Sequence, residues 1–332
     1  SLKWALFENE QRLRDGQAGE LHNQSDFEPA LAAALHALPA EPAAVCHRIV
    51  AAGAEWVGAR RWDAALAAQM RGLIPLAPDH LPQALAAVQT ATQLLPRASQ
   101  WACSDSGFHR NLPAVARSLA LPRAWTEAGI RRFGYHGLSC ESALAALQRD
   151  DPRRARGRII IAHLGSGCSL TAVRDGRSCD TSMGFTPLGG VVMATRSGDL
   201  DPGVLLYLLR ARGVTPEELN RRLNHESGLR GVSGISGDMK TLLADARPEA
   251  AAAVDLFVYS AKKCLGAMAA ALGGVDIIVF TGGIGEHAGV VRERIGAGME
   301  WLGAEVKVVA SDEEGVMTRH TLRALAEGGN GV

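Results

Sequence analysis

Three short glycine-containing corners constrain this chain more than any other feature of its sequence. Each adjoins an apolar stretch of the kind that forms a buried strand, and they occupy residues 163–167, 189–199 and 282–286. Backbone N–H groups approach a phosphate closely only where no Cβ intervenes, and a helix that follows adds a favourable dipole. One such corner is more often an ordinary tight turn. Three in one chain, two of them with an adjacent His or Arg, favour a polyphosphate ligand.

The apolar pattern between these corners indicates a mixture of strands and helices. Residues 275–280 are apolar apart from Asp276, which is typical of a strand covered on both faces. We expect strands at residues 2–7, 45–50, 158–164, 169–173 and 275–280. We expect helices at residues 29–38, 63–72, 84–95, 113–121, 201–212, 216–224, 248–272 and 289–302. Polar residues 8–19 predict a loop or hairpin, and glycine-rich residues 228–237 predict a loop.

The length of the chain sets the number of domains. At 332 residues and 35.0 kDa, the chain can form about two domains, each with a core of its own. The charged turn at residues 149–158 contains Pro152 and Gly157 and is the kind of segment that connects subdomains.

Charge and cysteine usage narrow the class of partner. The 35 Lys and Arg balance the 35 Asp and Glu, so no net field attracts nucleic acid or an anionic membrane. The longest apolar stretch, residues 265–280, contains two adjacent glycines and Asp276, and predicts a helix end, a turn and a strand instead of a membrane span. The six cysteines lack the spacing of metal or redox sites. Without a secretory signal, we expect reduced thiols in a soluble, cytoplasmic protein that acts on small molecules.

Five sequence strings carry a resemblance to a known family. They are RRFGYHGLS at residues 131–139, IIIAHLGSG at 159–167, DTSMGFTPLGG at 180–190, TRSGDLDPG at 195–203 and FTGGIGE at 280–286. Together and in this order they closely resemble the acetate kinase family of acetate and propionate kinases. The similarity extends over nearly the whole chain.

The resemblance implies an α/β fold of two similar actin/Hsp70-like (ribonuclease H-like) domains around a nucleotide cleft, as in the acetate and sugar kinase/Hsp70/actin superfamily. It places an N-terminal lobe at residues 1–109 and 315–332, with the C-terminal helix returning to it. The C-terminal lobe with the nucleotide-binding loops occupies residues 110–314. The implied reaction transfers phosphate from ATP, with Mg²⁺, to acetate or propionate in a homodimer and gives ADP and an acyl phosphate.

Four residues match the family's catalytic groups. Asp105 in CSDSGFH matches its acidic group near the transferred phosphoryl. Arg48 in CHRIV and Arg196 in TRSGD match two arginines at the substrate carboxylate and the phosphoryl oxygens, which a planar guanidinium can clamp. His136 in GYHG matches a histidine beside the phosphoryl in flight. Taken singly, these residues have simpler readings as a helix N-cap, exposed arginines and a buried structural histidine.

The resemblance also assigns the nucleotide, substrate and metal sites. The nucleotide is assigned to His163, Gly165, Ser166, Gly167, Asp238, Met239, Lys240, Gly283, Ile284 and Gly285. A small apolar pocket for the acyl methyl group would consist of Val50, Leu76, Tyr135 and Pro187. One methylene is worth only ~1–3 kcal/mol in such a pocket, so acetate and propionate are not separated. Glu313 in SDEEG matches a magnesium-associated glutamate, and its simpler reading is an exposed residue at a helix start.

The chain departs from the family pattern around these residues. Of the family's first phosphate loop, Asn-x-Gly-Ser-Ser-Ser-Leu-Lys, only residues 1–3 are present, so the first strand looks truncated and we expect the natural start upstream. Residues 51–53 read Ala-Ala-Gly in place of His-Gly-Gly. An Asn, an Asn and a Glu of the family are replaced by Ser166, His287 and Gly189. Between residues 302 and 313 the chain is shorter, which predicts the loss of a loop and an edge strand.

These departures leave three interpretations of the function open. The first is an acetate kinase-like phosphotransferase that works by direct in-line transfer. The second is a nucleotide-binding member of the same fold with weakened or lost catalysis, acting through domain closure or a partner. The third is a kinase for another short-chain carboxylate such as butyrate.

Overall fold

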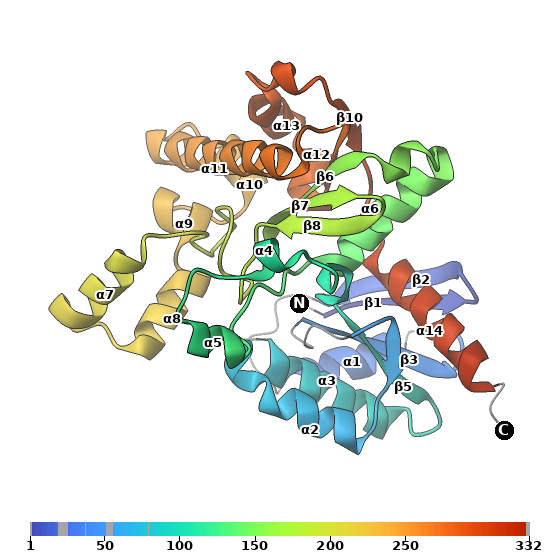
Figure 1. Ribbon diagram of the computed structural model, residues 1–332. Helices are drawn as coiled ribbons and strands as arrows, with labels where there is room; N and C mark the ends of the chain where they lie inside the picture. Colours follow the sequence, from blue (N-terminus) through green and yellow to red (C-terminus); the bar gives the residue numbers. More distant parts are fainter. Residues whose placement is uncertain (1, 19–25, 37, 51–55, 79, 330–332) are drawn as a thin grey trace. The chain divides into compact units, whose positions relative to one another are not determined.

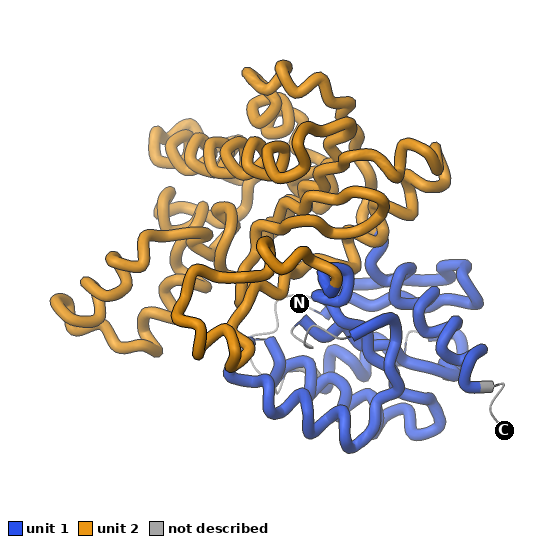
Figure 2. Tube along the Cα trace, in the orientation of Figure 1, with its two compact units in different colours: residues 1–110, 312–332 blue, residues 111–311 orange. Residues whose placement is uncertain are grey.

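The computed structural model describes residues 2–18, 26–36, 38–50, 56–78 and 80–329. The chain divides into two compact units, which Figure 2 colours separately. Unit 1 comprises residues 1–110 and 312–332, and unit 2 comprises residues 111–311. The charged turn at residues 149–158 lies inside unit 2, so it does not connect the two units.

Unit 1 contains a hairpin and a three-stranded sheet (Figure 1). Strands β1 (Leu2–Glu8) and β2 (Gln11–Ala18) pair antiparallel, so the polar segment after the first strand forms a hairpin. In the sheet, β5 (Ser99–Ser104) lies between β3 (Ala44–Ile49) and β4 (Ala59–Arg61). It runs parallel to β3 and antiparallel to β4.

Helices cover both elements of unit 1. Helix α14 (Glu313–Gly329) contacts β1, β3, β4 and β5. Helix α3 (Leu81–Leu94) contacts β3, and both α1 (Phe27–His36) and α2 (Ala64–Gly72) contact α3. The described residues of the unit also include two single turns of 3₁₀ helix, η2 (Ile74–Leu76) and η3 (Gly107–His109).

Unit 2 is built on a five-stranded mixed sheet. Strands β6 (Arg158–Leu164), β7 (Cys168–Arg174) and β8 (Arg177–Thr181) form an antiparallel meander. Strands β9 (Ile277–Thr281) and β10 (Glu305–Val308) continue the sheet beyond β6 as parallel neighbours, in the order β10-β9-β6-β7-β8. Because β6 and β9 are parallel, their carboxyl ends meet at one edge, and the glycine corners that follow them come together there.

The centre of this sheet is covered on both faces. Ile159, Ile160 and Ile161 are each fully buried, and successive side chains of a strand point to opposite faces. Helix α11 (Pro248–Leu272) contacts β6, β7 and β8, and α6 (Gly137–Asp150) contacts β6 and β9 (Figure 1). Short segments surround this core: α4 (Ala114–Arg117), α5 (Arg123–Glu127), η4 (Arg154–Arg156), α7 (Pro202–Ala211), α8 (Pro216–His225), α9 (Gly228–Ser233), α10 (Met239–Leu243), α12 (Gly282–His287), α13 (Gly289–Gly296) and η5 (Glu300–Leu302).

Several sequence-based expectations are wrong in detail. The glycine-rich segment expected as a loop begins with helix α9, and the helix expected at residues 113–121 is only the four-residue α4. The helix expected to reach residue 302 ends at Gly296 and is followed by η5. The predicted loss of an edge strand after residue 302 is also wrong, because β10 forms that edge by pairing with β9. Among the described residues, every helix is too short or too polar to cross a bilayer.

Candidate active site

The corner between β6 and β7 gathers hydrogen-bond donors of unit 2. The N–H of Gly165 donates to the carbonyl oxygen of Gly167 at 3.0 Å and closes the corner. A Cβ on Gly167 would lie 3.1 Å from Nε2 of His136 and 3.3 Å from Nη1 of Arg196. A Cβ on Gly165 would lie 3.4 Å from Nε2 of His163. The two glycines therefore leave room for two imidazoles and a guanidinium beside one turn of the backbone.

The two imidazoles of this corner stack on each other. The ring centroids of His136 and His163 are 4.2 Å apart, with 30° between the ring planes. Two positive charges at about this separation repel by roughly 4 kcal/mol at an effective dielectric constant of ~20. The pair therefore disfavours the state in which both rings are protonated.

Residue His136 also has a strained backbone. It occupies the left-handed region, with φ 59° and ψ 29°, at the N-terminal cap of α6. That conformation costs a non-glycine residue about 1–2 kcal/mol. Strain of this kind persists where the surrounding structure fixes a functional side chain, and here it directs Nε2 of His136 to Gly167.

The loop that carries Arg196 is fixed by its backbone. The N–H of Met193 donates to the carbonyl of Arg196 (3.2 Å), and the N–H of Leu229 donates to the carbonyl of Met193 (2.9 Å). Gly228 lies against this loop with φ +61°, and a Cβ there would be 2.3 Å from the oxygen of Met193. The guanidinium of Arg196 donates to the carbonyl of Pro187 at 3.3 Å. These contacts hold Arg196 beside the glycine corner.

A buried thiol next to the corner is inert. Cys168 donates its S–H to the carbonyl of Gly165 at 3.2 Å. Burial raises the pKa of this thiol to about 12, so the thiolate that nucleophilic chemistry requires is not formed near neutral pH.

The second glycine corner, after β9, lies beside the first. Gly282 has φ +77°, and a Cβ there would be 2.8 Å from the carbonyl oxygen of Leu164. The amide nitrogen of Gly283 lies 4.0 Å from the position of a Cβ on Gly165. The corner begins helix α12, and beyond Gly282 the N–H groups of its first turn have no carbonyl partner inside the helix, so they can bind an anion.

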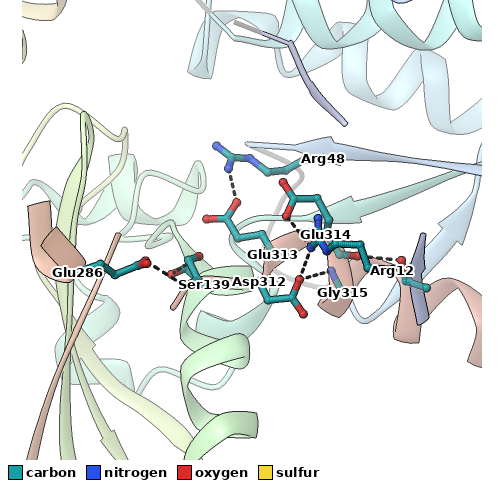
Figure 3. Close-up of polar contacts among 10 residues, drawn as sticks. Arg12, Arg48, Ser139, Glu286, Asp312, Glu313, Glu314 and Gly315 are labelled. Atoms are coloured by element: carbon teal, nitrogen blue, oxygen red, sulfur yellow. Dashed lines mark hydrogen bonds and ion pairs between the residues drawn. The ribbon is translucent and has the colours of Figure 1, made fainter. Parts of the chain in front are cut away.

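The side chain of Glu286 holds the backbone of this second corner by hydrogen bonds. Its Oε1 accepts hydrogen bonds from the N–H of Gly282 and from the N–H of Ser311, each at 3.0 Å. Ser311 also lies 3.4 Å from the hydroxyl of Ser139, which in turn is 2.8 Å from Nδ1 of His163. Figure 3 shows Glu286 directed toward Ser139. A chain of polar contacts therefore links the second corner to the imidazole at the first.

The segment expected to contact adenosine forms the start of α10. The carboxylate of Asp238 accepts from the N–H (2.9 Å) and the hydroxyl (2.8 Å) of Thr241, and these hydrogen bonds lower its pKa. Met239 is buried, whereas Lys240 is exposed. Asp238 is thus an N-cap, and its neighbour Met239 belongs to the core of unit 2.

Unit 1 carries the other charged residues. The guanidinium of Arg48, at the end of β3, donates to Glu313 Oε2 at 2.5 Å (Figure 3) and lies 4.0 Å from Asp105 Oδ2. Asp105 is 1% exposed, and its N–H bonds to the carbonyl of Ile49 at 2.9 Å. The carboxylates of Asp105, then Glu313 and Glu314, raise the pKa of Arg48 above its usual range. Arg12 pairs with Asp312 and with Glu314, which anchors the start of α14.

The four residues expected in the acyl pocket divide between the units. Val50 follows β3, and Leu76 ends η2, both in unit 1. In unit 2, Tyr135 is buried and donates its hydroxyl to the carbonyl of Phe185 at 2.6 Å. Pro187 is buried, and its carbonyl oxygen accepts the hydrogen bond from the guanidinium of Arg196. The neighbouring departure at residues 51–53 and the expectation for Ser1 lie outside the described residues.

The carboxylates of unit 1 suit a magnesium ion better than a softer metal. No group of three or more His, Cys, Asp and Glu side chains with metal-binding spacing occurs within the described ranges. Mg²⁺ needs only one or two carboxylates, because phosphate oxygens and water complete its shell. Asp105 and Glu313 supply hard oxygen donors around Arg48, so these residues fit Mg²⁺ bound together with a nucleotide.

The polar residues behind the histidines are not among the site residues expected from the sequence. Ser139 and Ser169 contact the two imidazoles, and Glu286 ties down the second corner. Ser139 and Glu286 lie inside the strings GYHGLS and FTGGIGE, which resemble the family. Their closeness in sequence to the expected site residues is therefore the one feature of the sequence that could have pointed to them. Their contacts run between residues 24, 33 and 25 positions apart, which periodicity does not reveal.

Known proteins resemble the chain over most of its length. The sequence profile of the Acetokinase family matches residues 8–322. The acetate kinase of Rhodopseudomonas palustris (strain TIE-1) is 44% identical over 310 residues, covering 86% of this chain and 78% of the relative. The acetate kinase of Porphyromonas gingivalis superposes with a TM-score of 0.82 at 33% identity, over 90% of this chain and 84% of that one. A propionate kinase from Francisella tularensis superposes with a TM-score of 0.78 at 31% identity, over 84% of this chain and 78% of that one.

Proposed function

The chain belongs to the Acetokinase family and has its α/β fold, and we propose that it transfers the γ-phosphoryl group of ATP to acetate or propionate. The products are ADP and an acyl phosphate. The observation that carries the proposal is the gathering of Arg196 Nη1 and the Nε2 atoms of His136 and His163 at the Gly165–Gly167 corner. Positive and N–H donors beside paired glycine turns are suited to phosphate oxygens.

The proposed reaction needs no proton transfer. A carboxylate oxygen forms a bond to the γ-phosphorus while the bond to the β,γ-bridging oxygen breaks, and that electron pair leaves with ADP. The nucleophile is already an anion, so charge is conserved without a general base. Catalysis then depends on positioning two anions and neutralising the charge that spreads over the transferred oxygens. Arg196 supplies a positive charge and the two imidazoles supply hydrogen-bond donors from unit 2.

We assign complementary tasks to the charged residues of unit 1. Arg48 orients the carboxylate and phosphoryl oxygens, while Asp105 and Glu313 hold Mg²⁺ and keep the Arg48 guanidinium in place through the contacts at 4.0 and 2.5 Å. When bound, Mg²⁺ neutralises phosphate oxygens and orients the polyphosphate. The nucleotide loops in this assignment are residues 165–167 and 283–285.

The test of this proposal is the formation of an acyl phosphate. Purified protein with ATP, Mg²⁺ and acetate is expected to yield a hydroxamate when hydroxylamine traps the product. No hydroxamate with acetate, propionate or butyrate, together with tight ATP binding by calorimetry, would support the nucleotide-binding module instead. An unchanged heat of binding for Arg196→Ala would further favour that module.

The length of the preferred carboxylate is a separate question for the same assay. Each added methylene changes transition-state binding by ~1–3 kcal/mol, which is roughly 10- to 200-fold in kcat/KM. Comparing acetate, propionate and butyrate therefore separates the first proposal from a kinase for a longer acid. A kcat/KM highest with butyrate contradicts the assignment to acetate or propionate.

Glu313→Gln is expected to raise the Mg²⁺ concentration needed for half-maximal activity by about 10- to 100-fold, the range found when metal-site partners are removed. The amide keeps the shape of the side chain but loses the charge that attracts the cation. The measurement is initial rate against free Mg²⁺ after treatment with EDTA. Glu314→Gln is the matched control, because Glu314 is the next residue on α14 but pairs with Arg12. Equal Mg²⁺ curves for the two variants would remove Glu313 from the metal site.

We further propose that two copies of the chain associate through α7. Every residue of this helix, all within the described part of the chain, is at least partly exposed, although its sequence is PGVLLYLLRA. Val204, Leu206 and Tyr207 are 44%, 48% and 53% exposed. An apolar helix face of this kind is typical of a protein interface, and a second copy offers the same face for a two-fold contact.

Leu206→Glu is therefore expected to reduce the particle mass from twice 35.0 kDa to the mass of one chain, because it places a charge inside the buried contact. Light scattering coupled to gel filtration measures this mass. Leu13→Glu is the control, since Leu13 is also 48% exposed but lies in unit 1. A single-chain mass for the unmodified protein contradicts the dimer.

The compartment we propose is the cytoplasm, where ATP is available. No disulfide joins the six cysteines, all of which lie in the described residues. Reduced thiols are the normal state of cysteine in a reducing compartment.

A further inference from the structure

We infer that Ser139 and Ser169 are positioning residues that hold Nδ1 of His163 and His136, so that Nε2 of each ring remains a donor at the Gly165–Gly167 corner. The inference rests on the proposed phosphotransfer, in which those Nε2 atoms face the phosphate. Neither serine belongs to the set of site residues expected from the sequence.

The two contacts have the same form. Ser139 Oγ lies 2.8 Å from Nδ1 of His163, and Ser169 Oγ lies 2.9 Å from Nδ1 of His136. Both serines have 0% exposure. The residues come from different elements, because Ser139 is in the first turn of α6 and His163 is on β6, whereas Ser169 is on β7 and His136 precedes α6. Two independent pairs thus place a buried hydroxyl on the inner nitrogen of a ring.

A hydroxyl on Nδ1 suits an imidazole that must donate from Nε2. A neutral ring carries one proton, so it donates at Nε2 only when Nδ1 is the acceptor. A serine O–H that donates to Nδ1 favours that tautomer. When the ring becomes charged, the same serine oxygen accepts from the Nδ1 proton, and Nε2 still donates. The serine therefore keeps the outer nitrogen a donor in both protonation states.

The stacking of the rings adds a reason for this arrangement. At 4.2 Å between centroids, protonation of one ring opposes protonation of the other. A ring that is neutral at this corner donates to a phosphate oxygen only when its proton is on Nε2. For that ring, an unassisted Nδ1 could hold the proton and present a lone pair to the phosphate oxygens, which would repel them.

The hydroxyl of Ser139 is itself supported by the second glycine corner. Ser311 Oγ lies 3.4 Å from Ser139 Oγ, and the Ser311 N–H donates to Glu286 Oε1 (Figure 3). Glu286 also accepts from the N–H of Gly282, which immediately precedes the proposed nucleotide loop at residues 283–285. The orientation of His163 is thereby tied to the backbone that is proposed to bind the nucleotide.

The experiment compares Ser139→Ala and Ser169→Ala with Ser142→Ala in the full chain. Ser142 is a buried serine on the same helix, one turn beyond Ser139, so it controls for the loss of any buried hydroxyl. Kinetics give kcat and the KM for ATP. Selective ¹⁵N labelling of histidine gives the chemical shifts of the ring nitrogens in the protein without nucleotide, with the signals assigned through His163→Gln and His136→Gln.

We expect kcat to fall about 10- to 100-fold for each of the two variants, as displaced catalytic groups commonly cause, with KM for ATP within threefold and Ser142→Ala near the unmodified protein. The Nδ1 signal of His163 should move in Ser139→Ala, and that of His136 in Ser169→Ala. Unmoved signals, or losses equal to that of Ser142→Ala, would overturn the inference. If the unmodified protein forms no acyl phosphate, the proposed function fails, while the nitrogen shifts still decide whether the serines hold the rings.

Discussion

Replacement of Arg196 by alanine is expected to lower kcat about 10³-fold, the scale on which an arginine at a transferred phosphoryl group acts. The guanidinium lies 3.3 Å from the position of a Cβ on Gly167, beside Nε2 of His136. Alanine removes the fixed positive charge at the place where negative charge spreads over the transferred oxygens. Rates of hydroxamate formation at saturating ATP and acetate measure the effect.

The matched control for this substitution is Arg222→Ala. Arg222 is also in unit 2, but its guanidinium pairs with Glu218 one turn away on the exposed side of α8, and such pairs contribute only ~0.3–0.5 kcal/mol. We expect its kcat within twofold of the unmodified protein. Arg196→Lys should fall between the two, because lysine keeps the charge and loses the planar fork. A loss below tenfold in Arg196→Ala, with normal thermal stability, would show that the arginine does not stabilise the transition state.

The sequence was most informative where a strand runs into a glycine corner. The strand expected at residues 158–164 coincides with β6, and the one at 169–173 lies within β7. Apolar runs are short-range signals, and glycines mark where the backbone must turn tightly. That the corners after β6 and β9 meet follows only from the parallel pairing of these strands, which no local pattern specifies.

The predicted secondary structure is wrong where tertiary contacts outweigh the local preferences of the residues. The segment that begins at Gly228 contains three glycines in seven residues, which disfavours a helix. Helix α9 forms there because the N–H groups of Leu229 and Arg230 donate to the carbonyls of Met193 and Ala194, at 2.9 Å each. Strand β10 was unexpected for a similar reason, since only four residues pair with β9 and the surrounding chain is shorter than the family pattern.

The candidate site divides in the same way. Residue matching identified Arg48, Asp105 and Glu313, and the structure groups them within unit 1. It also identified the two histidines, which stack in unit 2. Residue matching did not identify the serine hydroxyls that contact the two rings. Serine is a common residue, and a contact between residues 24 or 33 positions apart produces no pattern in the local sequence.

The backbone around Arg196 yields the second large effect, in Gly228→Ala. A Cβ at this position would lie 2.3 Å from the carbonyl oxygen of Met193 and 2.7 Å from that of Arg196. Both neighbours are backbone atoms, so they cannot move aside as a flexible side chain would. We expect the free energy of unfolding to fall by roughly 3 kcal/mol or more, the range of severe single substitutions. In the folded fraction, kcat should fall because the loop that positions Arg196 is displaced.

Gly234→Ala separates the steric part of this loss from the conformational part. Gly234 ends α9, as Gly228 begins it, and the two have nearly the same backbone angle, φ +64° and +61°. No atom of the described residues outside its immediate neighbours lies within 4 Å of a Cβ on Gly234. Its replacement should therefore cost only the left-handed penalty of about 1–2 kcal/mol and leave kcat unchanged. Chemical denaturation measures both values, and equal losses in the two variants would mean that close approach of the Gly228 backbone does not hold the Arg196 loop.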